Sequence, residues 1–121
     1  MLVHLQPNLF NAQINSSSMK SNLQYAFSAK SVAIIGASRN PGKIGYVCLE
    51  NFVKGTFHGK IYPVNPNATE ILNQKCYPSI GAIKESVELA VITIPGEFVP
   101  KAIEECGKKK IPNSIIISAG F

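Results

Sequence analysis

The residues best suited to chemistry lie in one short segment, AIIGASRNPGKIG, which begins at Ala33. Glycines lack a Cβ atom, so Gly36 and Gly42 allow the chain to turn sharply and bring its amides close to a ligand. Unpaired amides at the start of a following helix attract an anion. Arg39 and Lys43 add positive charge at the same point. The segment predicts a phosphate-binding loop between a strand and a helix.

The spacing of the glycines tests which phosphate ligand is bound. A triphosphate loop of the GxxxxGK[ST] type fails, because Gly36 and Gly42 stand six positions apart and Ile44 follows Lys43. The dinucleotide fingerprint GxGxxG matches only in part, because Ser38 occupies the position of its middle glycine. A nucleoside triphosphate is therefore excluded, and a dinucleotide is not.

The end of the second expected strand argues against a nicotinamide cofactor. Enzymes that bind NAD usually present Asp or Glu to the ribose there, whereas this chain has Asn65, Pro66 and Asn67. Short-chain dehydrogenases share the letters GAS, but their glycines are closer together and their Tyr-x-x-x-Lys pair is missing from this sequence. An NAD(P)-binding oxidoreductase domain is therefore the weaker alternative.

Apolar runs alternate with amphipathic segments along the chain, which predicts strands that alternate with helices. We expect strands at residues 31–35, 60–64, 75–77, 89–94 and 114–118, and helical segments at 22–28, 43–54, 68–72, 79–84 and from 100 onward. The fold class is α/β, a Rossmann-like doubly wound parallel sheet. We expect the natural domain to continue beyond this fifth strand.

Ligands of such sheets bind beyond the carboxyl ends of the strands, where the strand order reverses. The loops at residues 36–45, 65–67 and 95–97 each follow an expected strand. We therefore expect these three loops to meet at one edge of the sheet and to form the binding site together.

Length and composition fit one globular domain. The 121 residues are 45% apolar and 16% charged, which excludes a disordered chain. No apolar run approaches the ~20 residues of a membrane span. The net charge of +5 suits a polyanionic ligand. A nucleic-acid ligand would be supported by this charge alone, so we do not expect one. We expect Lys108, Lys109 and Lys110 only to complement a helix dipole.

The spacing of the cysteines and the composition of the amino-terminal residues indicate in which compartment the protein is located. Cys48, Cys76 and Cys106 form no CxxC pair, so we expect small buried side chains, no metal site and a cytoplasmic protein. The first eighteen residues hold no Lys or Arg and lack the features of a signal peptide. We expect residues 1–20 to form a loose tail, with an alternative start at Met19, and residues 21–121 to form the domain.

Several segments together resemble a known family. The stretches SVAIIGASRNPGKIGY, GKIYPVNPN, CYPSI, LAVITIPGEFVP, AIEECG and IIISAGF are similar to the CoA-binding domain of ADP-forming acyl-CoA (acetyl-CoA) synthetases, relatives of the succinyl-CoA synthetase alpha subunit. The resemblance runs from about Leu23 to Phe121. It implies that the cofactor is coenzyme A.

The resemblance also implies the site. The first loop would wrap the phosphates of coenzyme A, the second would lie near its adenosine, and the third would border the nucleotide and the pantetheine. Gly96 departs from the family, where alanine is usual. The implied binding residues are Gly36, Ala37, Ser38, Arg39, Asn40, Pro41, Gly42, Lys43, Asn65, Pro66, Asn67, Ile94, Pro95 and Gly96.

In the family, acid, CoA and ATP give acyl-CoA through a phosphohistidine on the next domain, which an ATP-grasp domain or subunit phosphorylates. Neither His4 nor His58 matches that histidine. The resemblance therefore implies a chain that binds CoA or acyl-CoA and needs both partners, in cis or in trans, to turn over. A stand-alone CoA-binding protein, or the CoA-binding module of a lysine acetyltransferase, is the alternative.

Overall fold

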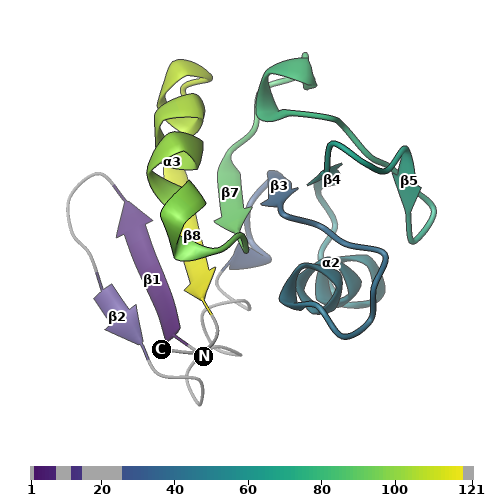
Figure 1. Cartoon of the computed structure of the whole chain (residues 1–121). Coiled ribbons are helices and arrows are strands. Elements are labelled where there is room, and N and C mark those ends of the chain that lie inside the picture. The colour runs from purple at the N-terminus through teal and green to yellow at the C-terminus, as the bar shows by residue number, and fades with distance from the viewer. Residues whose placement is uncertain (1, 8–11, 15–25, 119–121) are drawn as a thin grey trace.

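The computed structural model describes residues 2–7, 12–14 and 26–118. Six strands form one sheet in the order β2-β1-β8-β7-β3-β4, and β5 and β6 form a separate hairpin (Figure 1). The strands are β1 (Leu2–Pro7), β2 (Ala12–Ile14), β3 (Ser31–Ile35), β4 (Lys60–Val64), β5 (Glu70–Ile71), β6 (Gln74–Lys75), β7 (Leu89–Ile92) and β8 (Asn113–Ser118). The helices are α2 (Ile44–Lys54) and α3 (Val99–Lys108), with short 3₁₀ turns η2 (Ile80–Ala82) and η3 (Gly96–Phe98).

The central strand β3 determines where a ligand can bind. It pairs in parallel with β4 on one side and with β7 on the other, and β7 pairs in parallel with β8. The chain therefore moves outward from β3 to β4 and then returns to the opposite side of β3. Because Ile35 lies opposite both Val64 and Ile92, the carboxyl ends of the three strands meet at one edge.

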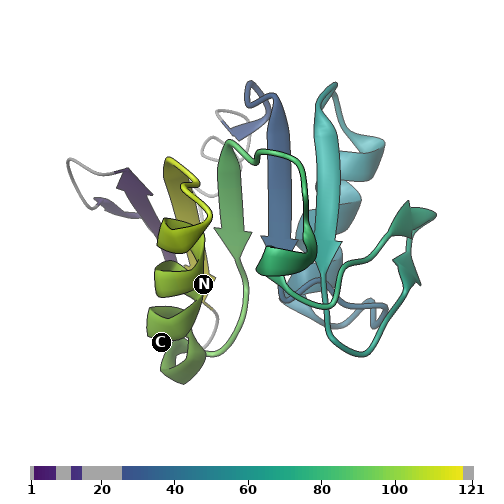
Figure 2. The ribbon, with the colours of Figure 1, turned by 90° about the horizontal axis from the view of Figure 1, so that it is seen from above.

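Alternation along β3 builds a core on each face of the sheet. Val32 and Ile34 belong to a buried cluster with Phe52 of α2. Ala33 and Ile35 belong to a second cluster, which includes the buried face of α3. Figure 2 shows α2 and α3 on opposite sides of the sheet. The predicted Rossmann-like, doubly wound α/β fold is confirmed.

Most predicted elements are confirmed within two residues of their ends. The strands expected at 31–35 and 60–64 have those bounds, and the other two core strands are Leu89–Ile92 and Asn113–Ser118. Helices α2 and α3 and the single turn η2 are also present. The helix expected at 22–28 falls largely outside the described residues.

The segment between β4 and η2 was predicted only in part. The helix expected at 68–72 is replaced by the β5–β6 hairpin, whose turn residues Leu72 and Asn73 have φ values of 51° and 63°. The strand expected at 75–77 is confirmed in part, since Lys75 belongs to β6 and Tyr77 forms a parallel bridge with Val64. Ile71 is only 2% exposed and belongs to the α2-side core. Burial of this β-branched side chain and the left-handed preference of Asn73 favour the hairpin over a one-turn helix.

The amino-terminal segment also differs from the expected loose tail. Strand β1 pairs antiparallel with β8 along its whole length, from Leu2 opposite Ser118 to Pro7 opposite Asn113, and β2 pairs with β1. An edge strand such as β8 exposes unpaired backbone groups that another strand can satisfy. No helix of the described residues is long and apolar enough to span a bilayer.

The lysines after α3 do more than complement its dipole. Lys108 forms an ion pair with Glu104 at 3.4 Å, and the Nζ of Lys109 donates a hydrogen bond to the carbonyl of Ile83, directly after η2. The second contact joins the end of α3 to η2. The expectation that these lysines only complement the helix dipole was therefore wrong.

Lys110 ends α3 in a conformation that favours glycine. Its φ is 64°, and the next amide, that of Ile111, donates to the carbonyl of Cys106 at 3.0 Å. We expect Lys110→Gly to raise the free energy of unfolding by about 1 kcal/mol, because a Cβ atom is unfavourable in this region. Denaturant titration measures the change. Lys110→Ala removes the same charge but keeps the Cβ atom, so an equal gain from both variants would contradict backbone strain as the cause.

Candidate functional site

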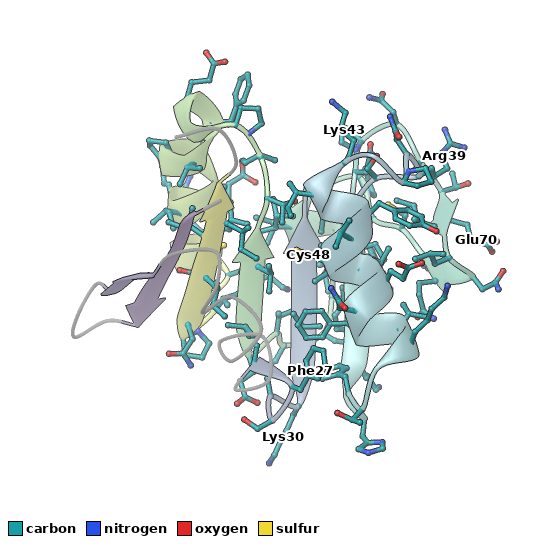
Figure 3. All side chains as sticks on the ribbon, turned by 90° about the horizontal axis from the view of Figure 1, so that it is seen from below. Phe27, Lys30, Arg39, Lys43, Cys48 and Glu70 are labelled. Carbon is teal, nitrogen blue, oxygen red and sulfur yellow. The ribbon has the colours of Figure 1, made fainter. Side chains whose placement is uncertain are left out.

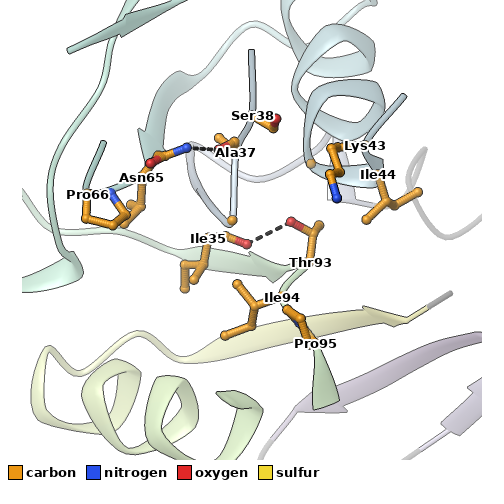
Figure 4. Close-up of a pocket in the computed structure, with 13 residues that line it drawn as sticks. Ile35, Ala37, Ser38, Lys43, Ile44, Asn65, Pro66, Thr93, Ile94 and Pro95 are labelled. Carbon is orange, nitrogen blue, oxygen red and sulfur yellow. Dashed lines mark hydrogen bonds between the residues drawn. The ribbon is translucent and has the colours of Figure 1, made fainter. Parts of the chain in front are cut away.

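A cavity of about 350 Å³ lies where β3, β4 and β7 end (Figure 4). All three predicted loops contribute to it, as expected from the strand order. The predicted residues that line it are Gly36, Ala37, Ser38, Lys43, Asn65, Pro66, Ile94 and Pro95. The predicted residues outside the lining are Arg39, Asn40, Pro41, Gly42, Asn67 and Gly96. Lining residues absent from the predicted set are Ile35, Ile44, Gly45, Val64 and Thr93.

Gly36 forms the turn that leaves β3. Its φ is 92°, and its amide donates to the carbonyl of Val64 at 3.1 Å. A Cβ atom at this position would lie 2.7 Å from Oγ1 of Thr93 and 2.8 Å from Cγ2 of Ile94. Both the backbone conformation and the lack of space therefore require glycine here.

Gly45 brings the start of α2 against this turn. A Cβ atom on Gly45 would overlap the carbonyl of Gly36. No side chain caps the helix, and among the described residues no acceptor is bonded to the amides of Ile44 and Gly45. Both residues line the cavity. The helix start therefore offers unpaired N–H groups and the positive end of its dipole to an anion there.

The loop from Ser38 to Lys43 is shaped by its own side chains. The amide of Asn40 donates to Oγ of Ser38 at 3.0 Å, and the amide of Gly42 donates to Oδ1 of Asn40 at 2.9 Å. The amide of Lys43 donates to the carbonyl of Asn40 at 2.9 Å. Asn40 thus stabilises the loop through its side chain and its backbone carbonyl. The Ser38 hydroxyl accepts one bond and keeps its own proton for a ligand.

Asn65 joins the second loop to the first. Its Nδ2 donates to the carbonyl of Ala37 at 2.9 Å, and its Oδ1 accepts from the amide of Asn67 at 2.7 Å (Figure 4). An aspartate could not donate the first of these bonds. In the sequence, Asn65 stood out only because it is not a carboxylate. In the structure it holds two walls of the cavity together.

Thr93 is the polar residue that the sequence analysis missed. It is 8% exposed, and both its hydroxyl and its amide donate to the carbonyl of Ile35 at 2.8 Å. It therefore links the ends of β3 and β7 beside the Gly36 turn. The sequence did contain a signal for this role, because Thr93 places a hydroxyl directly after the apolar run Leu89–Ile92. A polar group at such a position needs a hydrogen-bond partner.

The charge at this edge is positive. Arg39 and Lys43 are exposed and form no ion pair within the described residues, and no carboxylate lines the cavity. Figure 3 shows both cations at one end of the sheet and Lys30 at the other. Burial raises the pKa of the Cys76 thiol, and hydrogen bonds to the carbonyls of Asn65 and Tyr77 and the charge of Arg39 oppose that rise in part.

The cysteines are buried, as predicted, and are free thiols. Burial raises the pKa of Cys48 to about 12 and that of Cys106 to about 11, so both stay protonated at neutral pH. The described residues contain no group of His, Cys, Asp and Glu side chains that could hold a metal ion. His58 is exposed.

Comparison with known families agrees with this geometry. The model of the CoA binding domain family matches residues 30–120. The chain therefore belongs to this family, and the resemblance found in the sequence is confirmed.

Three relatives illustrate the similarity. The chain is 50% identical over 99 residues to acetate–CoA ligase (ADP-forming) of Methanocaldococcus jannaschii, which covers 82% of this chain and 14% of that protein. It is 47% identical over 104 residues to the alpha subunit of acetate–CoA ligase (ADP-forming) I of Pyrococcus furiosus, at 83% and 22% coverage. Dinucleotide-forming acetyl-coenzyme A synthetase 1 of Candidatus Korarchaeum cryptofilum, solved with phosphate and ADP, superposes with a TM-score of 0.70 and 36% identity, at 82% and 21% coverage. The chain spans less than a quarter of the length of each.

The contact between Gly36 and Gly45 can be tested by stability. We expect Gly45→Ala to lower the free energy of unfolding by about 1–3 kcal/mol, because the new methyl group must displace a backbone carbonyl. Gly107→Ala is the matched control in α3, where a Cβ atom meets nothing within 4 Å. It should stabilise by roughly 0.5–1 kcal/mol. Thermal or urea unfolding measures both, and a neutral Gly45→Ala would contradict the close contact.

Proposed function

We propose that this chain binds coenzyme A in the cavity at the carboxyl ends of β3, β4 and β7. The observation that carries the proposal is the glycine turn at Gly36, seated against the uncapped start of α2 in a member of the CoA binding domain family. Unpaired amides, Arg39 and Lys43 together favour a ligand with several phosphates. The lack of a carboxylate favours coenzyme A over NAD, whose ribose hydroxyls are usually held by one.

The three loops divide the ligand between them. The loop from Ser38 to Lys43 holds the phosphates, with charge-assisted hydrogen bonds from its cations. The segment Asn65–Asn67 lies beside the adenosine, and the segment from Ile94 to Gly96 borders the nucleotide and the start of the pantetheine. Asn65 acts by positioning the first loop through Ala37.

The activity that we propose for the whole protein is that of an ADP-forming acetate (acyl)–CoA ligase. Its relatives bear this name, and this chain covers their CoA-binding part only. The phosphohistidine and the ATP-grasp unit would come from other domains or subunits. His58 does not supply the histidine, because it precedes β4 and so lies at the amino edge of the sheet, opposite the cavity.

A ligand series tests the proposed cofactor. Isothermal titration calorimetry should show coenzyme A binding roughly tenfold to 150-fold more tightly than dephospho-coenzyme A, because the ribose phosphate adds a charge-assisted contact worth about 1.5–3 kcal/mol. NAD, which lacks both that phosphate and the pantetheine arm, should bind more weakly than either. Tighter binding of NAD than of coenzyme A would overturn the proposal.

Single substitutions test the position of the phosphates. Arg39→Ala and Lys43→Ala should each weaken coenzyme A binding by about 1–3 kcal/mol, with nearly unchanged melting temperatures, since both side chains are exposed. Lys30→Ala is the matched control, because Lys30 is also exposed but lies at the opposite end of the sheet. If all three variants bind like the parent chain, the phosphates lie elsewhere.

A further inference from the structure

The hydroxyl of Thr93 lies in a hollow that two glycines leave open. A Cβ atom built on Gly36 would be 2.7 Å from Oγ1 of Thr93, and one built on Gly45 would be 3.1 Å from it. Gly36 directly follows β3, Gly45 belongs to the first turn of α2, and Thr93 directly follows β7. One hydroxyl therefore lies against both the glycine turn and the start of the helix.

The peptide group between Ile35 and Gly36 is held from both sides. Its carbonyl accepts hydrogen bonds from the amide and from the hydroxyl of Thr93, each at 2.8 Å, and its amide donates to the carbonyl of Val64 at 3.1 Å (Figure 4). The orientation of this peptide determines the direction in which the chain leaves β3. It therefore also determines where the carbonyl of Gly36 meets Gly45.

The hydroxyl of Thr93 is the part of this arrangement that depends on the side chain. Any residue except proline could supply the amide bond, whereas the second bond needs a hydroxyl. Thr93 is 8% exposed and lines the cavity. Because the hydroxyl donates its proton to the carbonyl of Ile35, that proton is not available to a phosphate. Thr93 can thus act on an anion through the turn rather than by direct contact.

We propose that Thr93 is a positioning residue for the phosphates of bound coenzyme A. Its hydroxyl fixes the peptide between Ile35 and Gly36, and through that turn it fixes the unpaired amides of Ile44 and Gly45. The inference rests on the proposed function. Binding groups must be held within about 0.5 Å of their productive positions, and hydrogen bonds weaken steeply when they are misaligned. A turn that is free to shift would therefore bind phosphates more weakly.

Ser31 offers a matched control at the other end of β3. It is also 8% exposed, and its hydroxyl donates to the carbonyl of Ser86 at 3.4 Å and accepts from the amide of Glu88 at 2.9 Å. Ser31 begins β3, whereas the cavity lies where this strand ends. Ser31→Ala therefore removes an equally buried hydroxyl from the same sheet at a distance from the cavity.

The experiment compares Thr93→Ala, Thr93→Ser and Ser31→Ala with the parent chain. Calorimetry measures the dissociation constants of coenzyme A and of adenosine 3′,5′-bisphosphate, which has the nucleotide and the ribose phosphate but no pantetheine arm. Amide hydrogen exchange, followed by NMR without ligand, reports on the bond from Gly36 to Val64. Thermal unfolding checks that each variant is folded at the temperature of the titration.

We expect Thr93→Ala to raise both dissociation constants by roughly threefold to tenfold, the equivalent of one hydrogen bond. The amide of Gly36 should exchange faster in this variant than in the parent chain. Thr93→Ser keeps the hydroxyl, so it should bind both ligands within about twofold of the parent chain. Ser31→Ala should change neither dissociation constant.

Four results would contradict these expectations. Parent-like binding by Thr93→Ala, or binding by Thr93→Ser that is as weak as that of Thr93→Ala, would overturn the inference and leave the proposed function standing. Weaker binding with unchanged exchange at Gly36 would assign Thr93 a direct contact with the ligand and overturn its positioning role. Equal weakening by Ser31→Ala would assign the effect to general stability. Failure of the parent chain to bind either ligand would overturn the proposed function itself.

Discussion

The close contact of two glycines determines the geometry of this edge of the sheet. Because neither Gly36 nor Gly45 has a Cβ atom, the start of α2 can rest on the carbonyl at the end of β3. The contact brings the unpaired amides of α2 to the cavity floor, and Thr93 and Val64 hold the turn from the neighbouring strands. Without it, the helix start and its dipole would move away from the cavity in which we propose that the phosphates bind.

The two edges of the sheet use polar groups differently. At the amino edge they satisfy one another: the carboxylate of Glu88 accepts from the amide of Lys30, and the hydroxyl of Ser31 accepts from the amide of Glu88, both at 2.9 Å. At the carboxyl edge Arg39 and Lys43 have no partner within the described residues. Paired groups stabilise the fold, whereas unpaired cations remain available to a ligand.

Local sequence patterns predicted the central strands of the sheet correctly. Ser31–Ile35 was predicted to the residue, because an apolar run buried on both faces needs no knowledge of its neighbours. Lys60–Val64 was also predicted to the residue, and its last three residues are buried. The segment around Ile71 was predicted wrongly, since its structure depends on a core that comes from distant parts of the chain. Thr93 was missed for a related reason: its partner, the carbonyl of Ile35, is 58 residues away.

The sequence alone determined the α/β class, the glycine turn after β3 and the meeting of three loops at one edge, because each follows from local spacing and strand order. Tertiary structure decided how the loops are joined, through the bond from Asn65 to Ala37. It also decided that β1 covers the free edge of β8. These features arise from contacts between residues far apart in the chain, which periodicity and spacing do not encode.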